Sequence, residues 1–135
     1  MMKEWQVYSL LAVLIWGVWG FLSKLSVDKL GSLHAYLAFS LGALILPIFI
    51  MPFVHLPSIS ISLWIAIITG FLGGIGTFLL SRAFVTGRAN VVIPITAQYI
   101  LITVFIATAF YREPLTLTKI AGIALSVAAI ILLSI

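Results

Sequence analysis

The stretch VVIPITAQYILITVFIATAFY, residues 91–111, contains no Lys, Arg, Asp or Glu over a length that can cross a membrane. An α-helix rises 1.5 Å per residue, and the hydrocarbon core of a bilayer, about 30 Å thick, needs about 20 apolar residues. A charge at the centre of such a helix costs about 2.5–3.5 kcal/mol or more. The stretch therefore predicts a transmembrane helix.

Four more stretches share this property, and the charged residues of the chain fall between the stretches or at their edges. Only 7% of residues are charged and 64% are hydrophobic, whereas a soluble domain is about 25% charged. A β-barrel is excluded because its strands alternate between apolar and polar residues. We expect an all-α, multi-pass membrane protein with one domain, residues 1–135, in the plasma (inner) membrane of a prokaryote. The expected spans are residues 5–22, 33–53, 61–81, 91–111 and 118–135.

The seven basic residues stand singly or in pairs near span ends, which is typical of membrane flanks and not of a nucleic-acid surface. No cysteine is present, and His34 and His55 lie near the ends of spans. These residues provide neither a nucleophile beside a base nor a metal-ligand set. We therefore expect no enzymatic activity, no catalytic residue, no metal site and no cofactor.

Five bulky aromatic or amide side chains in the expected spans are poor residues for close helix packing. Aromatic residues offer flat walls with a polar edge, and a glutamine offers two donors and an acceptor. For the glutamine, an interhelical hydrogen bond worth about 0.6–2 kcal/mol is an equal alternative. The candidate substrate-binding residues are Trp16, Trp19, Tyr36, Gln98 and Tyr99.

Small residues at helical spacing predict faces on which helices approach closely. We expect helix-packing roles for Gly70, Gly74, Gly122 and Ser126. Trp5 and Trp64 lie where an aromatic belt would meet the membrane interface, so we assign them to that belt.

The second half of the chain carries a pattern of short motifs. The motifs are Gly87-Arg88-Ala89, Pro94-Ile95-Thr96, Tyr99, Glu113-x-Leu115-Thr116 and Gly122-Ile123-Ala124-Leu125. With Trp16-Gly17, this pattern resembles the EamA domain of the drug/metabolite transporter superfamily over about residues 5–135. The chain departs from the pattern at Ile100, where a proline is common, and at Arg112, where a glycine is common.

The resemblance implies a transporter in which two such domains, ten helices in all, are arranged as an inverted repeat and export amino acids, metabolites or drugs. This chain has one five-helix domain, and five spans place its two termini on opposite sides of the membrane. The basic residues are nearly balanced between the two sides. Lys3, Arg112 and Lys119 lie on the amino-terminal side, and Lys24, Lys29, Arg82 and Arg88 lie on the other.

A strong excess on one side would fix the orientation, so the balance favours insertion in both orientations. We expect an antiparallel homodimer in the lipid bilayer, with a heterodimer with a second five-helix chain and a parallel dimer as alternatives. Because the spans contain no acid, we expect the solute to be a neutral or zwitterionic amphipathic molecule. The alternative function is a membrane scaffold or accessory subunit.

Overall fold

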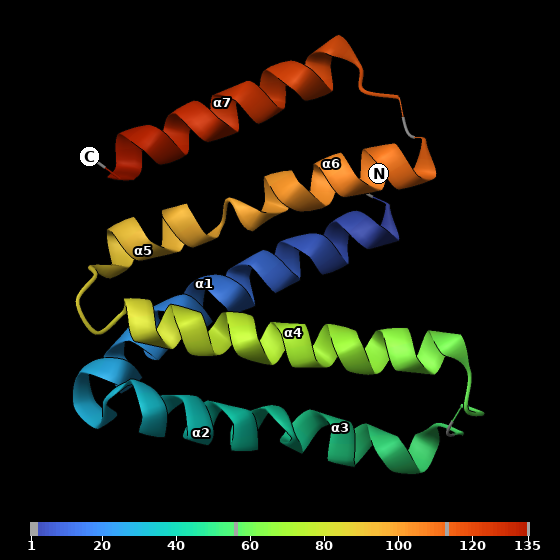
Figure 1. Ribbon diagram of the computed structural model, residues 1–135, viewed down its shortest axis with the longest axis vertical. Helices are drawn as coiled ribbons and strands as arrows, with labels where there is room; N and C mark the ends of the chain where they lie inside the picture. Colours follow the sequence, from blue (N-terminus) through green and yellow to red (C-terminus); the bar gives the residue numbers. More distant parts are fainter. Residues whose placement is uncertain (1–2, 56, 113, 135) are drawn as a thin grey trace. The chain divides into compact units, whose positions relative to one another are not determined.

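The computed structural model describes residues 3–55, 57–112 and 114–134, which form helices and no strand (Figure 1). The helices fall into two compact units, Met1–Thr86 and Gly87–Ile135. The first unit contains α1, Glu4–Leu30; α2, Ser32–Ala43; α3, Ile45–Ile50; the 3₁₀ turn η1, Met51–Phe53; and α4, Ile61–Ala83. The second unit contains α5, Ala89–Thr96; α6, Tyr99–Tyr111; and α7, Leu117–Ser134. The prediction of an all-α chain is confirmed.

Helix α1 continues well beyond residue 22, the expected end of the first span. Its last turns carry charges that suit a helix leaving the membrane core, because Lys24 and Asp28 are one turn apart and pair at 2.6 Å. The helix ends at Gly31, whose φ of +77° is accessible to glycine at no steric cost. The end of the apolar run was therefore not the end of the helix.

The second apolar span, Ser32–Phe53, is interrupted near its middle at Leu44, between α2 and α3. Pro47 has no N–H to donate to the carbonyl of Ala43, and its ring crowds that carbonyl. At the same place, the Leu44 N–H donates to the Leu41 carbonyl at 3.2 Å, which is three residues earlier and not four as in an α-helix. The span is thus an interrupted helix.

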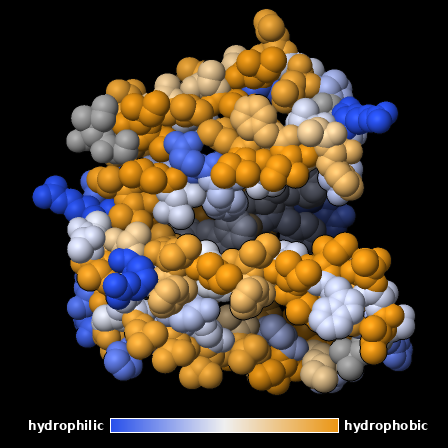
Figure 2. All heavy atoms as spheres, in the orientation of Figure 1, coloured by the Kyte–Doolittle hydropathy of each residue, from blue (hydrophilic) through white to orange (hydrophobic). Residues whose placement is uncertain are grey.

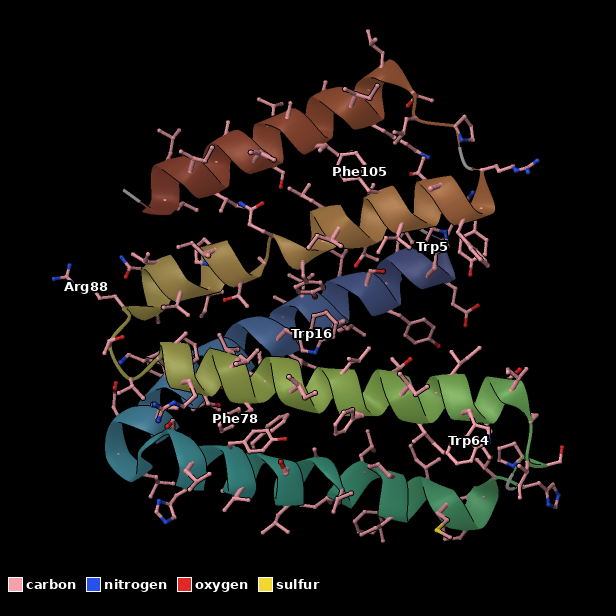
Figure 3. The ribbon with its side chains drawn as sticks, in the orientation of Figure 1. Trp5, Trp16, Trp64, Phe78, Arg88 and Phe105 are labelled. Atoms are coloured by element: carbon pink, nitrogen blue, oxygen red, sulfur yellow. The ribbon has the colours of Figure 1, made fainter. Side chains whose placement is uncertain are left out.

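Helix α4 packs along α2 in the first unit. The Ser60 hydroxyl accepts a hydrogen bond from the Leu63 N–H and caps the start of α4. Farther along, Phe78 of α4 meets Tyr36 of α2 edge-on, with 5.4 Å between ring centroids; Phe78 is labelled in Figure 3. Aromatic pairs favour this geometry, so the contact aligns the two helices.

In the second unit, the fourth span is also interrupted near its middle, at residues 97–98. The Gln98 and Leu101 N–H groups donate to carbonyls three residues earlier, as in a 3₁₀ helix. Pro94 removes one helical donor, and the Thr96 hydroxyl donates to the Val92 carbonyl, a bond that tends to bend helices. Helix α7 packs against α5.

Few side chains are buried within the described ranges, and the hydrophobic ones are Val27, Ala35 and Phe84. Hydrophobic side chains cover most of the visible face in Figure 2. Four stretches are long and apolar enough to cross a membrane: Glu4–Leu30, Ser32–Phe53, Ile61–Ala83 and Ala89–Tyr111. The apolar part of α7, Leu117–Leu133, is shorter and reaches the lower end of the usual length range. Such a surface requires lipid or another apolar partner around it.

Candidate functional site

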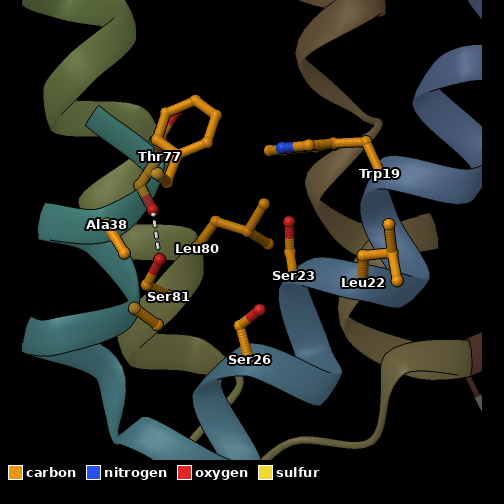
Figure 4. A pocket seen from close by; sticks show the side chains of 10 residues that line it. Trp19, Leu22, Ser23, Ser26, Ala38, Thr77, Leu80 and Ser81 are labelled. Atoms are coloured by element: carbon orange, nitrogen blue, oxygen red, sulfur yellow. Dashed lines mark hydrogen bonds between the residues drawn. The ribbon is translucent and has the colours of Figure 1, made fainter. Parts of the chain in front are cut away.

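Helices α1, α2 and α4 line a partly open cavity of about 280 Å³ within the first unit (Figure 4). It lies among the last turns of α1 and α4 and the first turns of α2. Its lining contains no charged side chain. The lining residues are Trp19, Leu22, Ser23, Ser26, Ala35, Ala38, Phe39, Thr77, Leu80 and Ser81.

Hydroxyl groups from two helices face this cavity. On α4, the Ser81 hydroxyl donates to the Thr77 carbonyl at 3.0 Å, and the Thr77 hydroxyl donates to the Gly73 carbonyl at 2.9 Å. On α1, the hydroxyls of Ser23 and Ser26 point into the space and form no hydrogen bond with any described residue (Figure 4). The cavity therefore presents unused donors and acceptors.

The other side of the cavity is apolar and is formed by aromatic side chains. Trp19 is half-buried, and its ring lies 6.0 Å from that of Phe39, tilted by 56°. An indole ring offers a broad apolar face together with one N–H donor at its edge. The cavity thus has a flat apolar side and a hydroxyl-bearing side.

Polar contacts hold the helix ends together beside the cavity. The Lys24 ammonium donates to Asp28 Oδ1 at 2.6 Å and to the Phe84 carbonyl at 2.9 Å. The Arg82 guanidinium donates to the Ser32 hydroxyl at 3.3 Å. Both basic side chains thus already have partners within the first unit. No group of three or more metal-ligating side chains occurs among the residues searched, which are those the structure describes.

The predicted substrate-binding residues occupy different environments. Trp19 lines the cavity, whereas Trp16 is 61% exposed on α1 and Tyr36 packs against Phe78. Gln98 and Tyr99 belong to the second unit, where Tyr99 is 55% exposed. In the first unit, the structure therefore brings Trp19 alone of these residues to the cavity.

Gln98 lies at the interruption between α5 and α6. Its backbone bonds are complete, because its N–H donates to the Ile95 carbonyl and its carbonyl accepts from the Leu101 N–H. Its half-buried side-chain amide bonds to no residue that the structure describes. Both assignments of this amide, solute binding and an interhelical hydrogen bond, therefore remain predictions.

Two of the predicted packing residues lie at a second groove, of about 390 Å³, formed by α6 and α7. These are Gly122 and Ser126. Gly74 lies against α2, where an added Cβ would stand 3.2 Å from the Tyr36 hydroxyl oxygen. A Cβ on Gly70 or Gly122 would meet no atom within 4 Å. The packing roles of these residues remain predictions.

Ser23 and Ser26 were not predicted as site residues because both follow the expected end of the first span. Their spacing of three residues places them on one face of a helix, which was the available signal. Thr77 and Ser81 are four residues apart and so share one face of a helix, but nothing in the sequence places that face opposite the two serines.

The sequence matches a family model of EamA-like transporters over residues 3–135. The chain belongs to the EamA-like transporter family. It is also 33% identical over 133 residues to an uncharacterized protein of Methanocaldococcus jannaschii, an alignment that covers 96% of this chain and 95% of the relative. No solved structure matches the chain. Family membership confirms the resemblance and makes this an integral membrane protein of a transport family. Of the motif residues, Glu113 lies outside the residues that the structure describes.

Proposed function

We propose that this EamA-family chain is a secondary transporter, a permease or exporter, that works as an antiparallel dual-topology homodimer. Its substrates are small neutral or zwitterionic amphipathic metabolites, such as amino acids or drugs. Alternating access at a site between the two copies moves the solute across the membrane. The observation that carries the proposal is the family match, together with nearly balanced flanking charges. We take the four long apolar helices and the shorter apolar helix α7 as five membrane crossings, which is an odd number.

The need for a second copy follows from the geometry of inverted-repeat transporters. Their substrate site lies near the bilayer midplane between two repeats that are related by an axis in the membrane plane. Two copies of an odd-span unit meet this requirement if they insert in opposite orientations. Three basic side chains on one side and four on the other impose little orientational preference.

The interrupted helices support transport rather than a purely structural role. Transporter sites are commonly built from discontinuous helices, whose freed backbone groups face a cavity. In this chain, the interruptions at Leu44 and at residues 97–98 both lie near the middle of their spans. The exposed Trp16 and the unbonded Gln98 amide add aromatic and polar side chains that a second copy and a solute can use.

The absence of an acid from the expected spans sets the substrate class. A cationic solute would have no counter-charge there, and burying an unpaired ion is costly. We place the protein in the plasma membrane of a prokaryote, which the origin of its relative in Methanocaldococcus jannaschii supports.

The topology test uses reporters at the carboxyl terminus, one active in the cytoplasm and one active outside it. We expect both reporters to be active, because copies insert in both orientations. Activity of one reporter alone contradicts dual topology. If one orientation is found and activity requires co-expression with a second five-helix chain, the heterodimer replaces the homodimer.

The transport test measures flux into liposomes that contain the purified protein, with a panel of amino acids, neutral metabolites and dyes. We expect saturable flux of at least one uncharged or zwitterionic solute. A parent protein that moves none of them supports the scaffold or accessory-subunit alternative.

A further inference from the structure

Seven serine and threonine hydroxyls inside these helices donate to the carbonyl four residues earlier. This arrangement uses the hydroxyl hydrogen and leaves little polarity for a ligand. The residues with this bond are Ser9, Ser40, Thr69, Thr77, Ser81, Thr96 and Thr103.

Thr108 and Ser126 of the second unit lack this bond, and so do Ser23 and Ser26, which lie in the last turns of α1. Ser23 and Ser26 both line the cavity of the first unit, and both are half-buried. A hydroxyl in such a place loses part of its contact with water, and it recovers that free energy only through a polar partner. Each of these hydroxyls can donate one hydrogen bond and accept others, and Ser81 across the cavity can still accept.

We propose that this cavity binds an uncharged solute that carries hydroxyl or amide groups, with one apolar face against Trp19. The inference rests on the proposed transport function and narrows its substrate class. Ser23 and Ser26 on one side and Ser81 on the other bind the polar groups. At about 280 Å³, the cavity falls just below the range of drug-sized sites, so the solute is small.

The cavity offers no counter-charge to a bound cation. No lining side chain is charged, and the nearby basic groups are bonded to Asp28, to the Phe84 carbonyl and to Ser32. An ammonium inside would therefore have no counter-charge, because Asp28 is already paired with Lys24, and its desolvation would be uncompensated. Zwitterionic amino acids and organic cations are thus poor ligands for this cavity.

The test measures equilibrium binding to the full purified chain in lipid nanodiscs, where no gradient is needed. The probes are methyl glucoside and N-acetylglycinamide, both uncharged, with leucine as the zwitterion and choline as the cation. We expect saturable binding of at least one uncharged probe and none of leucine or choline. Binding of no uncharged probe, or binding of leucine or choline at the cavity, overturns the proposal.

Variants identify the cavity as the place of binding. We expect Ser23→Ala and Ser26→Ala each to weaken binding about threefold to tenfold, because each removes one hydrogen bond. Ala38→Leu fills the cavity and is expected to abolish binding, while helix content by circular dichroism stays unchanged. Ser9→Ala is the matched control, since Ser9 lies on the same helix but bonds to the Trp5 carbonyl outside the cavity. Parent-like binding by all three cavity variants overturns the inference.

Probe binding and liposome flux, measured on the parent and on Ala38→Leu, distinguish a failure of this inference from a failure of the transport proposal. If the uncharged probe binds as expected but the liposomes show no flux of any solute, the cavity assignment stands and the transport proposal falls. If the liposomes transport a solute whose flux Ala38→Leu leaves unchanged, and no uncharged probe binds, the cavity assignment falls and transport stands.

Discussion

The Lys24 ammonium donates a hydrogen bond to the carbonyl oxygen of Phe84 at 2.9 Å, although the two residues lie 60 positions apart in the chain. Phe84 follows the end of α4, where carbonyl groups lack helical partners and carry partial negative charge. Its side chain is fully buried. The contact joins α1 to α4 beside the cavity, and Asp28 holds the ammonium in place.

We expect Lys24→Met to lower the free energy of unfolding by about 1–2 kcal/mol, because a charged hydrogen bond to a partly buried carbonyl is lost. The side chain of Lys24 is 23% exposed, so solvent screening keeps the effect modest. Unfolding in increasing dodecyl sulfate, followed by circular dichroism, measures the change. Lys29→Met removes the same charge from an exposed residue that bonds to no described residue, and it should leave stability unchanged. Equal effects of the two substitutions would contradict a specific role for the Lys24 contact.

Gly74 provides the room that the Tyr36 hydroxyl occupies. An alanine Cβ at residue 74 would stand 3.2 Å from that oxygen, whereas one at Gly70 would meet nothing within 4 Å. We expect Gly70→Ala to stabilise α4 by about 0.5–1 kcal/mol through helix propensity, and Gly74→Ala to gain less. In a double-mutant cycle, Tyr36→Phe should restore the missing gain, with a coupling energy of about 0.5–1 kcal/mol. A coupling energy of zero would show that the hydroxyl moves aside freely.

Arg112 ends α6 in the left-handed conformation, with φ of +53°. This conformation costs a residue with a Cβ about 1–2 kcal/mol, and glycine avoids that cost. Arg112 also occupies the position where the family pattern commonly has glycine. We expect Arg112→Gly to raise the free energy of unfolding by about 1 kcal/mol relative to Arg112→Ala, which removes the same charge and keeps the Cβ. Thermal unfolding of the two variants in one detergent makes the comparison, and equal stability would contradict a strained left-handed residue.

Substitutions at Gln98 and Trp16 test the assignment of these residues to substrate binding. We expect Gln98→Ala and Trp16→Ala to lower solute flux in liposomes about tenfold, while protein yield and helix content stay unchanged. The reason is that each removes a side chain that makes no hydrogen bond within the described chain but can meet a solute or a second copy. Trp5→Ala and Trp64→Ala, at the expected membrane interface, are the controls and should retain most of the flux. Parent-like flux by both Gln98→Ala and Trp16→Ala would overturn the assignment.

Arg88 offers a clean test of orientation, because it is exposed and its side chain bonds to no described residue. We expect Arg88→Gln to shift the population toward copies with the amino terminus in the cytoplasm, since basic flanks prefer that side. The paired reporters at the carboxyl terminus measure the ratio. A Lys119→Gln substitution, on the other side of the membrane, should shift the ratio in the opposite direction. A ratio that neither substitution changes would contradict the charge-balance argument.

Much of the fold was readable from charge placement alone. The second to fourth spans agree closely with the structure, because a run that excludes charge is a local property of the sequence. The first helix is longer than the apolar run that predicted it. Lys24 and Asp28 ended the apolar run, yet they pair along the helix and let α1 continue to Leu30.

The sequence by itself determined that the chain is a set of membrane helices and that it belongs among EamA-like transporters, since apolar run length and motif spacing are properties of the chain read in order. Only the tertiary structure decided that Ser23 and Ser26 face Ser81 and Trp19 across one cavity. That juxtaposition depends on contacts between residues far apart in sequence, such as the bond from Lys24 to Phe84, which set how the ends of α1 and α4 meet.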